Sequence, residues 1–350
     1  MSSRSQNATM LAYDFYPSEG GLQAFMHSMV GADVGIAWTV LTRKADARLL
    51  IRGRRYSVVR TAMRPQLRIR DRLWLKSRRG QATLPEIIVF QTKRKLVSLG
   101  RRTNAGFLFA DQLCSALSVR AAARLLRIPW GLAVYGKELL PEKPETRNLL
   151  SDADLVIACS AFARELAISR GACEDKTRVL HPAADTTFFT PPTDRDAAKK
   201  KFGVSGRKVL VTVAHLVPRK GHEFVIGALQ PVRVVYPDVV YFIVGRGPSE
   251  DYLRNLARDL RVAEAVRFCG YVASSDLPRY YGAADIHIMP STCSGDVEGF
   301  GISFIEAAAC GTPSIGSRSG GIPDSIADGE TGLLVEPGDV RAFRQQSCGC

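Results

Sequence analysis

Short apolar runs alternate along the chain with segments of helical periodicity. Runs rich in β-branched residues, such as residues 209–214 and 239–244, are typical of strands buried on both faces of a parallel sheet. Most of these runs are followed by a segment in which apolar residues recur every three or four positions, as in repeated strand–helix units. The sequence therefore predicts an α/β protein built from doubly wound parallel sheets.

The alternation is interrupted near residue 190. Pro191-Pro192 breaks the pattern, and a polar, charged stretch follows over residues 193–201. A chain of 350 residues can form two domains, each large enough to bury its own core. We expect one domain over residues 1–190 and a second over residues 191–350.

The pattern also predicts individual elements. Strands are expected at residues 10–13, 38–41, 57–60, 87–90, 107–110, 131–135, 155–158, 209–214, 239–244, 266–269 and 285–289. Helices are expected at residues 22–29, 120–126, 161–170 (with Ser160 as its cap), 222–236, 251–260 and 277–283, and from about residue 302. Ligands of such sheets bind beyond the carboxyl ends of the strands, so the loops at those ends are the candidate functional segments.

The composition narrows the class of protein. With 46% hydrophobic and 23% charged residues, the chain resembles ordinary globular proteins. It has no run of 18 apolar residues and no basic segment followed by a long apolar core at its start, so we expect neither a membrane-spanning helix nor a signal peptide. The eight cysteines form no CxxC pair and show no metal-ligand spacing, which favours reduced thiols in a cytoplasmic protein without a metal site.

The positive charge is concentrated in residues 43–124. This region holds 21 Lys or Arg against four Asp or Glu, a surplus of 17 that exceeds the net charge of +14 for the whole chain. Its densest part, residues 64–79, mixes cations with leucine, isoleucine and tryptophan. We interpret the region as a surface that docks on anionic lipid headgroups. A solvated basic face without a partner is the alternative; nucleic acid is not expected as a partner, because no nucleic-acid module accompanies the charge.

Residues 297–313, VEGFGISFIEAAACGTP, contain the most informative pattern. Glu298 and Glu306 flank a glycine turn, residues 299–301, and helical spacing begins near Ile302. The free N–H groups and dipole of a helix N-terminus suit a phosphate, and carboxylates accept hydrogen bonds from sugar hydroxyls. We expect Glu298 at the entrance of this site and Glu306 about one turn into the helix.

A basic pair follows the strand at residues 209–214. Arg219 and Lys220 lie in the loop HLVPRKG. A leaving nucleoside diphosphate gains negative charge, and two cations at about 4 Å can each offset roughly 4 kcal/mol at an effective dielectric constant of 20, before desolvation costs. The alternative is a solvated loop pair.

These segments resemble family 4 of the retaining glycosyltransferases. The segment 297–313 is similar to the donor-site signature of that family, and Arg219-Lys220 matches its diphosphate-binding pair. The resemblance covers most of residues 130–340 and touches residues 10–30. It implies the GT-B architecture, with two Rossmann-like doubly wound domains facing a central cleft. Members usually continue into a helix that crosses back onto the first domain, and this C-terminal crossing helix is expected to be missing here.

The resemblance also implies roles for individual residues. Glu298, Arg219 and Lys220 would be catalytic. The donor would be held by Glu306 at the ribose, by the amides of Phe300, Gly301 and Ile302 at the sugar or diphosphate, by Val272 at the base, and by Gly21 from the first domain. Tyr135 and Glu138, in a YGKE turn where many members have a histidine, would lie on the acceptor side. Tyrosine is a poor base at neutral pH, so a donor phosphate oxygen is the alternative base.

The function implied by the resemblance is that of a metal-independent hexosyltransferase. It would move a sugar from a nucleotide-diphosphate sugar, without a cofactor, to a saccharide or lipid-linked acceptor at the cytoplasmic membrane face. Two alternatives remain at this point. One is a truncated, non-catalytic remnant of the same fold that binds a nucleotide sugar or a membrane. The other is a different GT-B enzyme, such as a nucleotide-sugar 2-epimerase.

Overall fold

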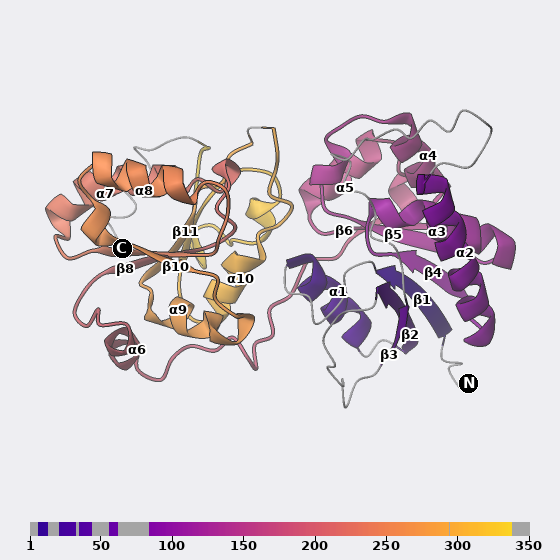
Figure 1. Cartoon of the computed structure of the whole chain (residues 1–350), viewed down its shortest axis with the longest axis horizontal. Helices are drawn as coiled ribbons and strands as arrows, with labels where there is room; N and C mark the ends of the chain where they lie inside the picture. The colour runs from indigo at the N-terminus through magenta and orange to yellow at the C-terminus, as the bar shows by residue number, and fades with distance from the viewer. Residues whose placement is uncertain are drawn as a thin grey trace. The chain divides into compact units, whose positions relative to one another are not determined.

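The computed structural model describes residues 6–12, 21–32, 35–43, 56–61, 84–293 and 295–337. It divides into two compact units, Met1–Leu180 and His181–Cys350, each built on one sheet (Figure 1). The basic segment 64–79 and the chain after residue 337, to which the expectation about the crossing helix applies, lie outside the described residues.

The described part of the first unit contains a seven-stranded parallel sheet in the order β3-β2-β1-β4-β5-β6-β7. Its strands are β1 (Gln6–Ala12), β2 (Ile36–Arg43), β3 (Ser57–Thr61), β4 (Phe107–Ala110), β5 (Trp130–Val134), β6 (Leu155–Ala158) and β7 (Thr177–Val179). Its helices are α1 (Gly21–Gly31), α2 (Leu84–Arg102), α3 (Leu113–Leu126), α4 (Pro144–Asp152) and α5 (Ala161–Ser169), with the short η1 (Lys137–Leu139) and η2 (Glu174–Lys176). The strand order reverses between β1 and β4, which is the topological switch point of this sheet.

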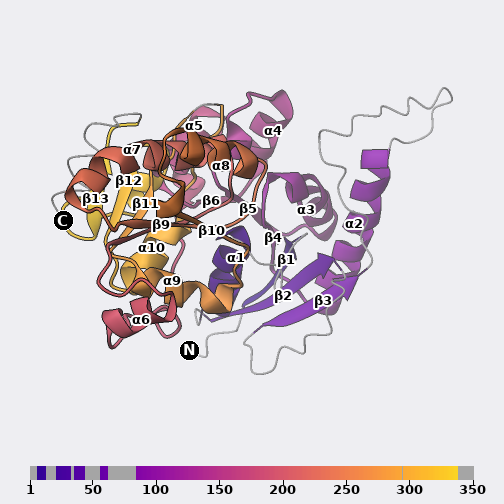
Figure 2. The ribbon, with the colours of Figure 1, turned by 60° about the vertical axis from the view of Figure 1, so that its left-hand side comes forward.

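The two faces of the first sheet are covered by different helices. Phe25 and Met26 of α1 pack with Met10, Val40 and Phe109 of the sheet, and α2 and α3 lie on the opposite side (Figure 2). The two helices approach closely at Gly100 of α2, where a Cβ atom would lie 2.8 Å from Cδ1 of Leu126.

The described part of the second unit contains a six-stranded parallel sheet in the order β10-β9-β8-β11-β12-β13. Its strands are β8 (Val209–Val213), β9 (Val240–Val244), β10 (Val266–Gly270), β11 (Ile286–Met289), β12 (Ser314–Ser317) and β13 (Gly332–Val335). Its helices are α6 (Arg195–Lys201), α7 (His222–Val235), α8 (Glu250–Asp259), α9 (Leu277–Ala283) and α10 (Ile302–Ala309), with the short η3 (Pro218–Lys220), η4 (Ala263–Ala265), η5 (Ser274–Asp276) and η6 (Ile322–Asp324). Here the order reverses between β8 and β11.

The pleat of the second sheet sorts its apolar side chains into two cores. Tyr241 and Ile243 of β9 belong to the core formed with α7 and α8, whereas Phe242 and Val244 belong to the core that includes Tyr281 of α9. Helices α7 and α8 accordingly lie on one side of the sheet, and α9 and α10 lie on the other (Figure 1). Strands buried on both faces explain the unbroken apolar runs in the sequence.

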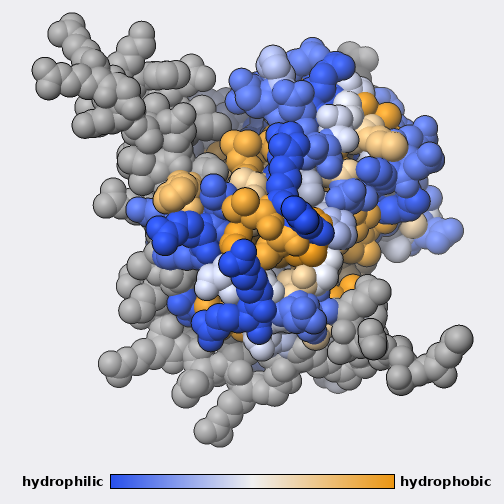
Figure 3. All heavy atoms as spheres, turned by 90° about the vertical axis from the view of Figure 1, so that its right-hand side faces the viewer, coloured by the Kyte–Doolittle hydropathy of each residue, from blue (hydrophilic) through white to orange (hydrophobic). Residues whose placement is uncertain are grey.

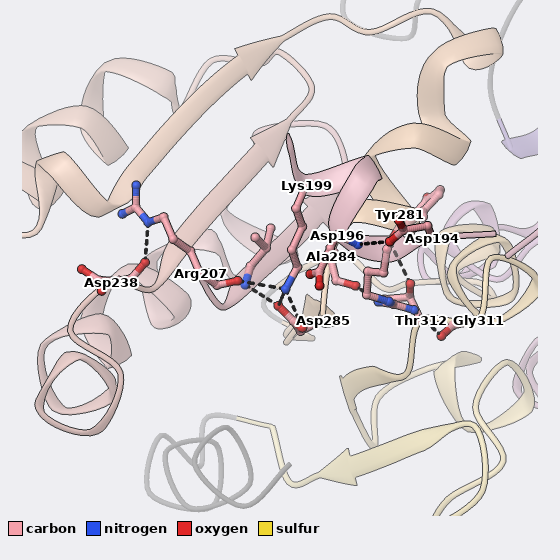
Figure 4. Close-up of polar contacts among 12 residues, drawn as sticks. Asp194, Asp196, Lys199, Arg207, Asp238, Tyr281, Ala284, Asp285, Gly311 and Thr312 are labelled. Carbon is pink, nitrogen blue, oxygen red and sulfur yellow. Dashed lines mark hydrogen bonds and ion pairs between the residues drawn. The ribbon is translucent and has the colours of Figure 1, made fainter. Parts of the chain in front are cut away.

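A buried ion pair fixes α6, which the sequence pattern had indicated only as a polar stretch. Nζ of Lys199 donates to the two carboxylate oxygens of Asp285 at 2.9 and 2.8 Å and to the carbonyl of Arg207 at 2.9 Å (Figure 4). Asp285 also accepts the backbone N–H of Val209 at 2.7 Å. These bonds join α6 to the amino-terminal ends of β8 and β11, so the opposite ends of both strands remain for a ligand site.

One local expectation is wrong, one strand was not predicted, and one expectation is confirmed. Residues 87–90 form part of α2 rather than a strand, because buried Thr92, Leu96 and Leu99 continue the helical spacing. Strand β12 was not predicted because it contains small residues, and a Cβ on its Gly316 would lie 2.6 Å from Ile326. Ser160 does cap α5, where its Oγ accepts the N–H of Ala163 at 3.1 Å.

Candidate functional site

The candidate site lies at the switch point of the second sheet. The loop that carries Arg219 and Lys220 follows β8, and the loop that carries Glu298 follows the neighbouring strand β11. The backbone N–H of Thr292 donates to the carbonyl of Arg219 at 2.8 Å and so joins the two loops. Open α/β sheets bind ligands at this place, because the diverging crossovers leave a crevice there.

Gly221 permits the close approach of the two loops. Its φ of +72° lies in the left-handed region, and a Cβ atom would lie only 2.2 Å from the carbonyl oxygen of Pro290. A glycine is therefore needed both for the backbone conformation and for the contact. It places the preceding pair, Arg219 and Lys220, against the loop after β11.

Both cations contact the same carboxylate. Nη1 of Arg219 donates to Oε2 of Glu298 at 2.7 Å, and Nζ of Lys220 forms an ion pair with that oxygen. Nε of Arg219 lies 3.1 Å from Oδ2 of Asp296, and Nζ of Lys220 lies 3.5 Å from the sulfur of Met289. Glu298 lies against the two cations, with 13% of its side chain exposed.

The ionisation of this cluster follows from its contacts. Burial alone would raise the pKa of Glu298, but Lys220 and Arg219 together outweigh burial and lower it. Burial lowers the pKa of Lys220, and Glu298 opposes that effect. Burial also lowers the pKa of His222 to about 4 and that of His287 to about 3, so both imidazoles are neutral at pH 7. The positive charge at the site therefore comes from Arg219 and Lys220.

The backbone of Glu298 is held by the loop between β12 and β13. The N–H of Gly321 donates to the carbonyl of Glu298 at 2.9 Å. A Cβ atom on Gly320, whose φ is +57°, would lie 2.3 Å from the same oxygen. The glycines of this loop therefore support the Glu298 backbone.

Helix α10 begins directly after this glutamate loop. Gly301 precedes Ile302 with a φ of +90°, and the side chain of Phe300 is buried. Glu306 lies one turn into the helix, as expected, and its carboxylate accepts a hydrogen bond from the Tyr281 hydroxyl at 2.8 Å. Burial raises the pKa of Glu306 to about 7.

The remaining predicted residue of the second unit lies after β10. Val272 is half-buried and packs on the core that contains Val244. Its neighbour Tyr271 is exposed, and the Arg246 guanidinium lies 6.0 Å from the tyrosine ring centroid. The loops after β9 and β10 thus present a cation and an aromatic ring to solvent beside the strand ends.

The predicted residues of the first unit also lie at strand ends or helix starts. Gly21 is exposed at the first position of α1. Tyr135 follows β5, where its hydroxyl donates to the carbonyl of Asp111 at 2.9 Å and its N–H donates to Oε1 of Glu138 at 2.6 Å. Burial raises the pKa of Tyr135 well above its ordinary value, and burial also raises that of Glu138. Tyr135 is therefore protonated at neutral pH.

The second unit thus brings Glu298, Arg219 and Lys220 into contact. The sequence reading missed Asp296 and Met289, although an acid two residues before Glu298 in a glycine-rich loop was a usable signal. In the part of the chain that is described, no three or more His, Cys, Asp or Glu side chains are grouped as metal ligands.

Comparison with known proteins finds a matching family model and relatives that align over nearly the whole chain. The family model described as "Glycosyl transferases group 1" matches residues 194–347. The chain is 33% identical over 349 residues, covering 95% of this chain and 86% of the relative, to the GDP-mannose-dependent alpha-(1-6)-phosphatidylinositol monomannoside mannosyltransferase of Mycolicibacterium smegmatis. It is 29% identical to the GDP-mannose-dependent monoacylated alpha-(1-6)-phosphatidylinositol monomannoside mannosyltransferase of Corynebacterium glutamicum. This match covers 97% of this chain and 87% of that one.

Solved structures agree at the level of the fold. The crystal structure of Anabaena Alr3699/HepE in complex with UDP and glucose matches with a TM-score of 0.76 at 21% identity, covering 99% of this chain and 89% of that one. A sucrose-phosphate synthase from Thermosynechococcus elongatus matches with a TM-score of 0.71 at 20% identity, covering 97% and 88%. Together with the near full-length relatives, these matches confirm the GT-B fold class. The chain belongs to the glycosyl transferases group 1, the family 4 glycosyltransferases, and is itself a glycosyltransferase.

Proposed function

We propose that the protein transfers mannose from GDP-mannose to a mannosylated phosphatidylinositol-type lipid, with retention of the anomeric configuration. The observation that carries this proposal is the 33% identity to a mannosyltransferase of that substrate class over 95% of the chain. The cluster of Arg219, Lys220 and Glu298 at the sheet's switch point supports it, since such a site suits an anionic donor.

The proposed roles follow the chemistry of the donor. The bond between the anomeric carbon and the β-phosphate oxygen breaks, and its electron pair leaves with GDP. Arg219 and Lys220 stabilise the charge that develops on the diphosphate, so no metal is required in this proposal. The acceptor hydroxyl attacks from the face that GDP leaves, and its proton passes to the departing phosphate oxygen. Glu298 contacts the transferred sugar, while the amides after it and Glu306 hold the sugar, diphosphate or ribose.

Tyr135 fits a binding role better than a base role. Its phenol is protonated at neutral pH because burial raises its pKa, and its hydroxyl already donates to Asp111. A proton acceptor on the departing phosphate is consistent with this arrangement. We propose Tyr135 and Glu138 as groups that shape the acceptor side, with Gly21 and Val272 contributing to the donor side.

We further propose that a face of the first unit docks on the cytoplasmic side of an anionic membrane. A groove of about 420 Å³ beside α2 and α3 is lined by Lys93, Arg94, Val97, Ser98, Arg101, Arg102 and Leu125. Phe90, Leu117 and Leu125 are exposed by 51%, 47% and 58%. Apolar side chains gather among hydrophilic ones on this side of the molecule (Figure 3). Each cation near such a surface contributes about 1 kcal/mol.

Membrane docking fits a lipid-linked acceptor. None of the helices in the described part of the chain is long and apolar enough to cross a membrane. The predicted docking region, residues 43–124, includes all the residues that line this groove except Leu125, while its segment 64–79 lies outside the described residues.

The proposal is tested by incubating the full chain with radiolabelled GDP-mannose and vesicles that contain phosphatidylinositol monomannoside. We expect labelled lipid to form, and UDP-glucose to replace GDP-mannose poorly. A chain that binds GDP-mannose but transfers nothing to any mannosylated phosphatidylinositol would support the non-catalytic alternative. Isomerised donor formed without acceptor would support an epimerase.

A further inference from the structure

His181 contacts two loops of the second unit, the loop between β12 and β13 and the loop that carries Glu298. Its Nε2 lies 3.0 Å from Oδ2 of Asp324, a residue 143 positions away in the sequence. Its ring also stacks on Phe300, with ring centroids 5.5 Å apart and an angle of 28° between the planes. Half of the His181 side chain is exposed, whereas only 17% of Asp324 is exposed. One imidazole therefore bridges an acidic side chain and a buried aromatic ring.

Phe300 occupies a sensitive position in the site. It lies between Glu298, which contacts both cations, and Gly301, which precedes α10. Gly301 has little freedom to move inward, because a Cβ on it would lie 2.7 Å from the ring of Phe304. We therefore expect a shift of the Phe300 ring to move the backbone amides at the start of α10.

Asp324 belongs to the same loop that supports Glu298. It ends η6, and Gly321 in that loop donates its N–H to the carbonyl of Glu298 at 2.9 Å. The loop between β12 and β13 thus holds residues 298–300 at two points, through Gly321 directly and through Asp324 by way of His181. Two attachment points fix the orientation of a short segment, which one point does not.

We propose that His181 and Asp324 are positioning residues that hold residues 298–301 in the conformation that receives the sugar-phosphate half of the donor. The inference rests on the proposed function for the identity of that donor. Neither residue touches the reacting atoms in this proposal; each acts through Phe300. We expect the two residues to affect binding of the β-phosphate and the mannose, but not binding of the guanine base.

The first test does not depend on the donor. Amide hydrogen exchange of the unliganded chain is compared between the parent protein, His181→Ala and Asp324→Asn. We expect faster exchange at residues 299–302 in both variants, with unchanged exchange at residues 270–273 after β10. Unchanged exchange at residues 299–302 would overturn the proposal that His181 and Asp324 hold this segment, whatever the donor proves to be.

The second test measures affinity for GDP-mannose and for GMP, which lacks the β-phosphate and the mannose. His181→Ala should weaken GDP-mannose binding about tenfold, equivalent to about 1.4 kcal/mol, and leave GMP binding unchanged. The double variant His181→Ala/Asp324→Asn should bind no more weakly than the weaker single variant, because both residues act through one contact. An equal loss for GMP, or fully additive losses, would contradict the proposal.

Two further variants separate positioning from simple folding. His181→Phe keeps a ring on Phe300 and should recover part of the lost affinity. Asp276→Asn, which removes an exposed 3.2 Å ion pair with Arg279, serves as the matched control and should change nothing. If the parent chain binds no GDP-mannose, the proposed donor is wrong. The exchange experiment alone then tests whether His181 and Asp324 hold residues 298–301.

Discussion

Oε2 of Glu298 accepts a hydrogen bond from Nη1 of Arg219 at 2.7 Å, although the two residues are 79 positions apart in the sequence. The same oxygen pairs with Lys220, so a single carboxylate contacts both cations of the loop after β8. In the proposed function, a donor diphosphate binds those cations. Glu298 must then share them with the diphosphate or turn toward the sugar.

Replacing Lys220 by alanine should reduce mannosyl transfer about 100- to 1,000-fold, the usual effect of removing one fixed donor to a developing anion. Lys220 is buried, so no solvent cation replaces it readily. The rate of labelled lipid formation at saturating acceptor measures the effect. Lys201→Ala, at an exposed lysine that ends α6, is the control and should keep full activity. Equal rates for the two variants would remove Lys220 from the site.

Gly221→Ala should lose both donor binding and thermal stability. Its φ of +72° is shared with Gly206, but a Cβ on Gly206 meets nothing within 4 Å, whereas a Cβ on Gly221 would meet the carbonyl of Pro290 at 2.2 Å. Gly206→Ala therefore carries only the backbone penalty of about 1 kcal/mol. The melting temperature and the GDP affinity of Gly221→Ala are compared with those of Gly206→Ala. Similar effects would show that the contact between the two loops is unimportant.

Much of the second unit could be predicted from the sequence, because runs rich in apolar and β-branched residues, such as residues 209–213 and 240–244, are typical of buried parallel strands. The loops at their ends followed from the same pattern. Strand β12 could not be found, since its small residues lack a large apolar signal. In the first unit, the run at residues 87–90 was too short to separate strand from helix by periodicity alone.

The site was predictable in its parts and not in its contacts. The glycine turn with two glutamates and the basic pair were visible as local patterns, and the structure joins Glu298 to that pair. The burial of Glu298 and the bond between His181 and Asp324 depend on residues far apart in sequence, for which spacing carries no signal.

Glu306 should make stability depend on pH. Burial raises its pKa from 4.5 to about 7 in the folded chain. Between these values the folded protein holds a proton that the unfolded protein has lost, so folding becomes less favourable as pH rises, by at most about 3 kcal/mol. Above pH 7 this loss is complete, and below pH 4.5 it is absent. Glu306→Gln should therefore gain melting temperature relative to the parent as pH rises from 4.5 to 8.

The matched control for this titration is Glu330→Gln, at an exposed glutamate of the second unit. Its melting temperature should follow the parent at every pH. A difference between Glu306→Gln and the parent that stays constant from pH 4.5 to 8 would show that Glu306 does not titrate in this range.

The face beside α2 should govern membrane binding. Arg94→Glu/Arg101→Glu alters two cations of the groove and should reduce binding to phosphatidylglycerol vesicles more than tenfold, since each cation contributes about 1 kcal/mol and repulsion is added. Lys200→Glu/Lys201→Glu makes the same change in net charge at exposed lysines of α6. Vesicle co-sedimentation should separate the two pairs. Equal losses in both would mean that net charge alone directs binding.

The exposed leucine of the same groove tests the apolar contribution. Leu125→Ser leaves the charge unchanged and should weaken vesicle binding at high salt, where electrostatic attraction is screened. Vesicle binding that disappears completely with salt in the parent chain would argue against insertion of apolar side chains.

The most direct measurement compares Glu298→Gln with the parent chain in two titrations, GDP binding by calorimetry and mannosyl transfer to lipid. Glutamine removes the negative charge that pairs with Arg219 and Lys220 but keeps the size of the side chain. We expect GDP to bind at least as tightly as to the parent, because both cations are released, while transfer falls about 100-fold or more. Weaker GDP binding together with unchanged transfer would contradict the assignment of this cluster as the donor site.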